Sequence, residues 1–205
     1  MMTRPECSIN GVSLMGPAVP RQNELFTADA LAFLAELHRE FGPRIEELNA
    51  AVTRQPANPA DRWRALVEKN LAEPPSTFVC PRRLAVEEHM ILCDGTAVSA
   101  GIVDFGLHIH RNARRLLSEG RAPFMSLLGM ESEEELQLWK DIFVRSEQLL
   151  DLPDCSIRAI HMQAGEPVMD DDEDGQASSA AVLMSRTPSA PEPAAPPLAH
   201  VGAAA

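Results

Sequence analysis

The chain has 205 residues, of which 45% are apolar, and this length and composition allow one domain with a core of its own. Its formal charge of −12 disfavours binding to nucleic acid or to an anionic membrane surface, because both are negatively charged. The four cysteines lie far apart without a C-x-x-C pair, which argues against a disulfide-rich scaffold and a zinc ribbon. No apolar run approaches the roughly 20 residues of a membrane span, and the N-terminus lacks a signal-peptide pattern, so we expect a cytoplasmic protein.

The N-terminal quarter divides into an irregular segment and a helix. Residues 1–24 show little hydrophobic periodicity and contain several glycines and prolines, which predicts an irregular lead-in. Apolar residues recur at helical spacing after Thr27, which suits an N-cap, so residues 25–53 are predicted to be helical. Because proline removes a backbone hydrogen bond from a helix, we expect this helix to bend or break at Gly42-Pro43.

The next segment, residues 54–75, is predicted to be a linker that contains a short helix. It begins with a stretch rich in proline and asparagine, which is typical of a linker. Trp63 and Leu66 are the expected apolar anchors of the helix, and Pro74-Pro75 ends it.

Strand and helix signals alternate in residues 76–165. One helix is predicted from an N-cap at Ser99 to a left-handed stop at Gly120. A second helix begins with a capping box formed by Ser132 and Glu135 and ends at Leu152-Pro153. Short apolar runs predict strands at residues 77–80, 89–93, 124–128 and 156–163, with a turn at Asp94-Gly95 after the second of them. This alternation predicts an α/β fold with a parallel sheet covered by helices.

Residues 166–205 differ in composition from the rest of the chain. Five consecutive acidic residues are followed by a stretch dominated by serine, alanine and proline, which predicts a disordered tail. Acidic residues and a glycine stand at four positions of an EF-hand calcium loop, namely Asp170, Asp172, Asp174 and Gly175. The twelfth position is Ala181 instead of glutamate, so a solvated acidic tail is the favoured interpretation.

Histidine and cysteine side chains suggest two further hypotheses. His108, His110 and His161 are candidate metal ligands, but residues two apart on a helix point in nearly opposite directions, which favours ordinary surface or interface histidines. Cys80 and Cys93 are candidate nucleophiles, yet neither has an evident histidine partner, which favours small buried side chains without a reactive role.

Several motifs in order resemble malate synthase of the single-chain type. The segment from Gly11 to Ala50 resembles the N-terminal segment and first helix of that family, and V-C-P-R at residues 79–82 resembles its V-R-P-R. The motifs D-F-G-L at residues 104–107, L-W-K-D-I-F at 138–143 and I-R-A at 157–159 follow in the family's order. The resemblance covers residues 11–53 and 76–160, that is, the N-terminal and early-barrel portions of the family only.

The resemblance implies a fold for each segment. The family fold is an eight-stranded β/α barrel with an N-terminal helical clasp, so residues 25–53 would be the clasp and residues 76–165 part of the barrel. The four or five strands that we predict cannot close such a barrel. We therefore expect a partial TIM-type β/α barrel, shortened and divergent, with an N-terminal helical clasp and a disordered tail.

The resemblance also implies a chemistry, in which acetyl-CoA, glyoxylate and water give malate and CoA in the glyoxylate cycle with the help of Mg²⁺. Cys80 occupies the position of the family's arginine, and Arg82 is a weak remnant candidate for its role, although an ion-pair or surface arginine is the favoured interpretation. The family's metal-binding glutamate corresponds to about Ala164, and Glu166 is the nearest acid. We find no counterpart of the second metal carboxylate or of the aspartate base.

These departures predict a catalytically incomplete relative that is inactive as an isolated chain. No metal site, cofactor-binding residue or cofactor is expected for this chain, and its catalytic residues cannot be named. The alternative is a non-catalytic interaction module that pairs with itself or with a complete malate synthase, because an incomplete barrel leaves strand faces and edges uncovered. A third possibility is activity completed by a second polypeptide.

Overall fold

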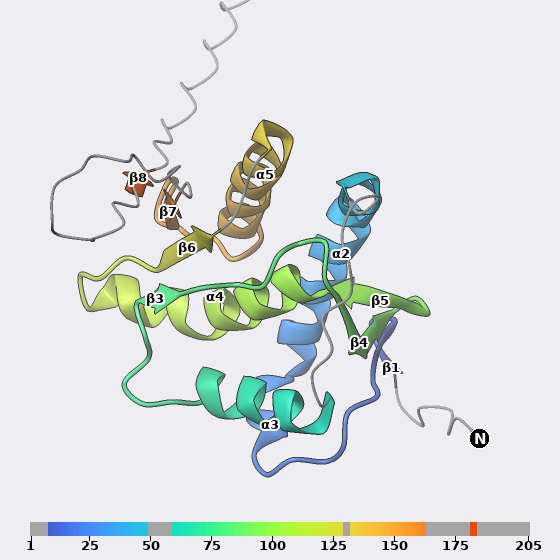
Figure 1. Ribbon diagram of the computed structural model, residues 1–205. Helices are drawn as coiled ribbons and strands as arrows, with labels where there is room; N and C mark the ends of the chain where they lie inside the picture. The colour runs from blue at the N-terminus through green and yellow to red at the C-terminus, as the bar shows by residue number, and fades with distance from the viewer. Residues whose placement is uncertain (1–7, 49–58, 129–131, 163–180, 184–205) are drawn as a thin grey trace, which may run out of the picture.

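The computed structural model describes residues 8–48, 59–128, 132–162 and 181–183 (Figure 1). The helices are α1 (Gln22–Leu25), α2 (Ala28–Leu48), α3 (Pro59–Asn70), α4 (Ala100–Ser118) and α5 (Glu133–Leu149). The strands are β1 (Ser8–Ile9), β2 (Val12–Leu14), β3 (Phe78–Val79), β4 (Glu87–Cys93), β5 (Thr96–Ser99), β6 (Phe124–Leu128), β7 (Arg158–Met162) and β8 (Ala181–Leu183). None of the described helices is long and apolar enough to cross a membrane.

The strands form two separate sheets. One sheet has the order β3-β6-β7-β8, in which β3, β6 and β7 run parallel and β8 pairs antiparallel with β7. The other is antiparallel throughout, with the order β1-β2-β4-β5. The predicted α/β fold with parallel strands is confirmed, and within the described residues the strands do not close into a barrel. Strand β4, which contains the predicted strand at residues 89–93, pairs with the N-terminal strand β2 and not with the parallel sheet.

The N-terminal segment is not an irregular lead-in, and this prediction is wrong for residues 8–14 and 22–25. Strands β1 and β2 form a hairpin, and short helix α1 follows. Asn10 and Gly11 have φ angles of 52° and 80° at the turn between the strands. Two successive positive φ values are typical of the type I′ turn, for which Asn-Gly is a preferred sequence. The Asn10-Gly11 dipeptide is therefore the feature of the sequence that indicates this hairpin.

Helix α2 begins where the sequence predicts but does not break. The Oγ1 atom of Thr27 accepts a hydrogen bond from the backbone N–H of Ala30 at 3.2 Å, which confirms the N-cap. The helix continues through Pro43 as far as Leu48, so of the predicted bend or break the break is wrong. Phe41 and Ile45, on either side of this proline, are buried, and the packing of α2 on α4 and α5 outweighs the loss of one backbone hydrogen bond.

Helix α4 lies at the centre of the molecule, between the two sheets and the other long helices (Figure 1). Both predicted end signals are confirmed, because the Ser99 side chain accepts a hydrogen bond from the Ile102 N–H and Gly120 has a φ of 73°. Gly106 lets α2 approach closely, since a Cβ atom at this residue would lie 2.6 Å from Cδ2 of Leu34. Helix α4 is therefore the central element of the fold and packs closely on α2.

Helix α5 covers the parallel sheet and supplies the aromatic part of the core. Its N-cap is Ser132, whose side chain accepts a hydrogen bond from the Glu135 N–H at 3.1 Å, as predicted. Trp139 packs edge-on against Phe105 of α4, with ring centroids 5.7 Å apart, and Phe143 lies 5.6 Å from Trp139. All three rings are completely buried.

The predicted short helix of residues 54–75 is α3, and Trp63 is its buried anchor. The indole ring of Trp63 stacks on Phe26 with centroids 4.9 Å apart and planes inclined by 6°. Of the predicted tail, Ala181–Leu183 form β8, and the remaining residues, including the candidate calcium positions Asp170, Asp172, Asp174 and Gly175, lie outside the described residues.

Candidate functional site

The carboxyl end of β3 carries the two site residues that the sequence singles out. Strand β3 ends at Val79, and Cys80 and Arg82 follow it at this edge of the parallel sheet. In β/α folds, ligand sites lie at the carboxyl ends of parallel strands. Cys80 is exposed and has a free thiol. The two residues therefore stand where a functional site is expected, but they differ sharply in their surroundings.

Arg82 is held by two carboxylates. Its Nε and Nη2 atoms each donate a hydrogen bond of 2.9 Å to Asp104 of α4, and its Nη1 donates one of 2.7 Å to Glu88 of β4. The backbone N–H of Arg82 also donates to Oδ2 of Asp104, at 3.0 Å. The side chains of Glu88 and Asp104 are only 8% and 11% exposed, so this is a largely buried ion-pair cluster.

The positive charge of Arg82 is balanced by two carboxylates of the protein itself. Burial alone would lower the pKa of Arg82, but the hydrogen bonds and charges of Asp104 and Glu88 outweigh it, and the pKa lies above its ordinary value. These contacts are those of an ion-pair arginine. Sequence reasoning did not identify Glu88 and Asp104 as its partners, although Asp104 belongs to the quoted D-F-G-L motif.

The cluster joins three neighbouring parts of the fold, namely the segment after β3, strand β4 and helix α4. The segment after β3 lies against the first turn of α4 so closely that a Cβ atom on Gly101 would meet the carbonyl oxygen of Arg82 at 2.7 Å. Glu88 accepts a further hydrogen bond from the N–H of Met90, at 3.2 Å. The geometry at Arg82 therefore depends on Gly101 as well as on the ion pairs.

We expect the Gly101→Ala variant to lose about 1–3 kcal/mol of the free energy of unfolding, because its methyl group clashes with backbone instead of a movable side chain. Urea denaturation followed by circular dichroism measures the loss. Gly42→Ala in α2 is the control, since the nearest atom to its Cβ outside its own helix backbone and chain neighbours is 3.6 Å away; Pro43 after it reduces the roughly 0.5–1 kcal/mol that alanine otherwise gains in a helix. Equal stability of the two variants would contradict the close approach.

Glu88 and Asp104 do not form a magnesium site. They converge on the Arg82 guanidinium, which fills the space between them, and the described residues contain no group of three His, Cys, Asp or Glu residues placed to hold a metal ion. The positions at about Ala164 and Glu166, where the family resemblance places a metal ligand, lie outside the described residues. The described residues thus do not fit the family's Mg²⁺, and we derive no step through it.

The candidate histidines of α4 face different neighbours. His110 packs on Phe33, with ring centroids 5.8 Å apart, whereas His108 is 5% exposed and its Nδ1 lies 3.3 Å from the side-chain amide of Asn112. The side chain of His161 lies outside the described residues. Cys93 is buried, and burial together with the neighbouring Asp94 carboxylate raises the pKa of its thiol, which disfavours the reactive thiolate.

His108 makes the stability of the protein depend on pH. Burial lowers the pKa of His108 from 6.5 to about 4, because the charged ring loses its hydration. Above pH 6.5 the ring is neutral in both folded and unfolded chains, and the full stability is present. Between pH 6.5 and about 4 the unfolded chain binds the extra proton, so stability falls as the pH is lowered, by about 3 kcal/mol in all.

The expected result is a urea midpoint that falls between pH 7 and pH 4 in the parent protein and falls less in a His108→Gln variant. The comparison is made between the slopes of stability against pH, so a general loss of stability in the variant does not affect it. Parallel slopes in the two proteins would contradict the assignment to His108.

Two family models match the chain in succession. The model "Malate synthase, N-terminal domain" matches residues 10–51, and the model "Malate synthase, TIM barrel domain" matches residues 76–169. The first match contains β2, α1 and α2, and the second contains the parallel strands with α4 and α5. The Arg82 cluster lies entirely within the second match.

Individual relatives agree with these models. The chain is 28% identical to a malate synthase of Streptomyces clavuligerus over 235 residues, which cover 70% of this chain and 43% of the relative. It is 38% identical to a glyoxysomal malate synthase of Candida tropicalis over 85 residues, covering 42% of this chain and 15% of the relative. The glyoxysomal malate synthase of Cucumis sativus is 37% identical over 102 residues, covering 48% of this chain and 18% of the relative.

The chain spans less than half the length of each of these relatives. The two matches nonetheless follow each other in the order of the family's domains, and the strands and helices that they contain are present in the structure. The chain belongs to the malate synthase family.

Proposed function

We propose that this member of the malate synthase family does not by itself condense acetyl-CoA with glyoxylate. The observation that carries the proposal is the engagement of Arg82 by Asp104 and Glu88, because three of the five N–H groups of its guanidinium donate to these carboxylates and its charge is balanced within the protein. Cys80, at the position of the family's arginine, offers an exposed thiol and no fixed positive charge. On this proposal the chain needs no Mg²⁺ or other cofactor of its own.

The arrangement of the strands supports the same proposal. Strand β8 pairs antiparallel with β7, at the edge where a β/α barrel would add its next parallel strand. Residues of the family's active site come from the ends of several strands, and the described sheet has three parallel ones. We also propose a cytoplasmic location, which the free thiols of Cys80 and Cys93 favour.

Release of CoA tests the proposal directly. The purified chain is mixed with acetyl-CoA, glyoxylate and Mg²⁺, and free thiol is measured against a sample without protein, with the Streptomyces clavuligerus malate synthase as the positive control. We expect no release above the protein-free sample. Turnover that depends on glyoxylate and increases with the concentration of the chain would overturn the proposal.

An interaction module is the second candidate function, and an exposed aromatic residue on the parallel sheet favours it. The Phe78 side chain is 47% exposed and stacks on Phe124 of the neighbouring strand, with centroids 6.3 Å apart. The Arg158 guanidinium of the third strand lies 5.9 Å from the centroid of Phe124. Exposed aromatic and arginine side chains are enriched in protein interfaces, so this face suits a second copy of the chain.

Sedimentation equilibrium distinguishes the two candidates. The module predicts a dimer that a Phe78→Asp variant weakens at least tenfold, or a complex when the complete Streptomyces clavuligerus enzyme is added. A monomer in both experiments would exclude the module. Malate formed only in the mixture, above the rate of the complete enzyme, would instead indicate activity completed by a second polypeptide.

A further inference from the structure

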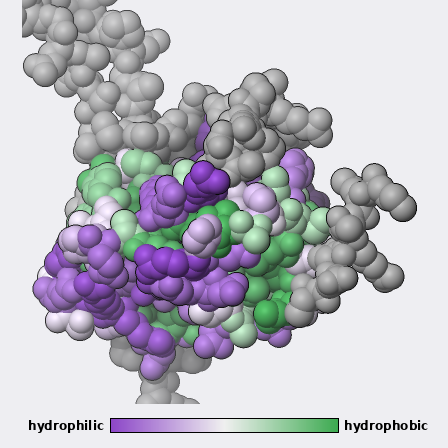
Figure 2. All heavy atoms as spheres, turned by 90° about the horizontal axis from the view of Figure 1, so that it is seen from below, coloured by the Kyte–Doolittle hydropathy of each residue, from purple (hydrophilic) through white to green (hydrophobic). Residues whose placement is uncertain are grey.

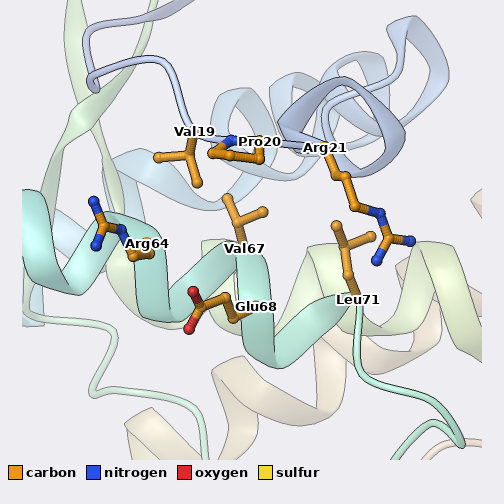
Figure 3. Close-up of a pocket in the computed structure, with 7 residues that line it drawn as sticks. All are labelled: Val19, Pro20, Arg21, Arg64, Val67, Glu68 and Leu71. Atoms are coloured by element: carbon orange, nitrogen blue, oxygen red, sulfur yellow. The ribbon is translucent and has the colours of Figure 1, made fainter.

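A pocket of about 490 Å³ lies between the N-terminal segment and helix α3, away from the Arg82 cluster (Figure 3). Its volume is within the range of about 300–1,000 Å³ that is usual for small-molecule sites. Two short stretches of the chain line it, one before and at the start of α1 and the other along one face of α3. The lining residues are Val19, Pro20, Arg21, Arg64, Val67, Glu68 and Leu71.

The middle of the pocket is aliphatic. In Figure 3, Val19 and Pro20 lie opposite Val67, and Leu71 follows directly after the end of α3. Val67 is 1% exposed and Leu71 is 7% exposed, so both are fixed by the core beneath them. Branched aliphatic walls of this kind suit a short, branched apolar group.

Two opposite charges stand at one end of this aliphatic surface. Arg64 and Glu68 are exposed residues one helical turn apart on α3; in Figure 3 Arg64 lies at one end of the pocket, and Glu68 lies beneath Val67 with its carboxylate directed toward that end. Among the residues that the structure describes, neither forms a hydrogen bond or an ion pair. Arg21, at the other end, is already paired with Glu24 through two contacts of 2.8 Å.

The pair of free charges restricts the chemistry of a ligand. A simple carboxylate would be attracted by Arg64 but repelled by Glu68. A simple amine, which is protonated, would be attracted by Glu68 but repelled by Arg64. The formal charge of −12 adds a general penalty for an anionic ligand. A zwitterion satisfies both side chains, because a carboxylate matches the guanidinium fork and an ammonium group matches the glutamate.

We propose that this pocket binds a free α-amino acid with an aliphatic side chain. Arg64 receives the carboxylate, Glu68 receives the ammonium group, and the side chain lies on Val67 and Leu71 beneath Val19. The proposal is independent of the proposed function, because the site shares no residue with the Arg82 cluster and its test measures binding without turnover.

Isothermal titration calorimetry with L-leucine at pH 7 tests the proposal on the full chain. We expect a dissociation constant on the order of 0.1–1 mM, which is usual for a small ligand with two charge-assisted contacts. Three analogues each remove one recognised group: 4-methylpentanoate lacks the ammonium group, 3-methylbutylamine lacks the carboxylate, and glycine lacks the aliphatic side chain. Each is expected to bind at least tenfold more weakly than leucine.

Two variants assign the contacts to residues. Arg64→Gln is expected to weaken the binding of leucine at least tenfold, and Glu68→Gln is expected to abolish the preference for leucine over 4-methylpentanoate. Lys69→Gln is the matched control, since Lys69 lies on the same helix but does not line the pocket. Circular dichroism verifies that each variant is folded.

The absence of a leucine signal, or equal affinity for leucine and 4-methylpentanoate in the parent protein, would overturn the proposal. Unchanged affinity in Arg64→Gln would overturn it as well. A result in the CoA-release assay, positive or negative, leaves this test unaffected, so failure of either proposal is recognised separately.

Discussion

Replacing Trp139 by alanine is expected to remove about 3–5 kcal/mol of the free energy of unfolding. The indole is completely buried between Phe105 of α4 and Phe143 of its own helix, and it joins α5 to the centre of the fold. Its removal leaves a cavity that the packed helices cannot fill, and aromatic contacts are lost as well. Urea denaturation followed by circular dichroism measures the change, which is a large fraction of the roughly 5–15 kcal/mol by which an ordinary domain is stable.

A second substitution in α5 serves as the control for Trp139. Val144→Ala removes an apolar side chain that is 43% exposed, and we expect it to change the free energy of unfolding by less than about 0.5 kcal/mol. A small effect of Trp139→Ala, equal to that of Val144→Ala, would show that α5 does not pack as described.

The Arg82→Met variant is expected to lose about 3–5 kcal/mol of the free energy of unfolding, because it leaves two carboxylates buried without a counter-ion. Glu88 and Asp104 are both close to fully buried, and each loses its charged hydrogen bonds when the guanidinium is removed. The antiparallel sheet and α4 would then separate more easily. The same urea experiment measures the loss.

Arg44→Met is the matched control for Arg82. The Arg44 side chain is 46% exposed, and its carboxylate partner among the described residues, Asp141 at 2.7 Å, is 36% exposed. Exposed ion pairs of this kind contribute about 0–1 kcal/mol. Partial recovery of stability in a variant that combines Arg82→Met with Glu88→Gln and Asp104→Asn would confirm that stranded charge is the cause, whereas no recovery would contradict it.

Local signals in the sequence predicted local structure well. The N-caps at Thr27, Ser99 and Ser132 and the stop at Gly120 are present because each depends only on residues within one helical turn. The turn at Asp94-Gly95, where both residues have positive φ, is likewise encoded in two residues. Structure that depends on a few neighbouring residues can therefore be predicted from the sequence, because tertiary contacts do not change it.

The wrong predictions concern elements whose structure depends on contacts with distant segments of the chain. Strands β1 and β2 have two and three residues, too few to show an alternating pattern, and they are stabilised by pairing with β4 about 80 residues away. Helix α2 continues through Pro43 because it is clamped by α4 and α5. Propensity alone cannot report such tertiary effects.

The candidate site was predicted only in part. The short apolar run predicted a strand at residues 77–80, with Arg82 two residues beyond it, and in the structure Cys80 and Arg82 both follow strand β3. The convergence of Glu88 and Asp104 on Arg82 requires that β4 joins the antiparallel sheet and that this sheet packs on α4. No spacing in the sequence encodes that arrangement, and the pocket beside α3 depends on a similar long-range contact.

Strand β8 has a consequence for the kinetics of assembly. It occupies the outer edge of β7 through the pairs Ile160 with Leu183, His161 with Val182 and Met162 with Ala181. A polypeptide that pairs with this edge of β7 must displace a covalently tethered competitor, whose effective concentration is high whatever the dilution of the protein. Strand exchange at this edge will therefore proceed at a rate that is limited by the release of β8, and it will become independent of the partner's concentration when that partner is in excess.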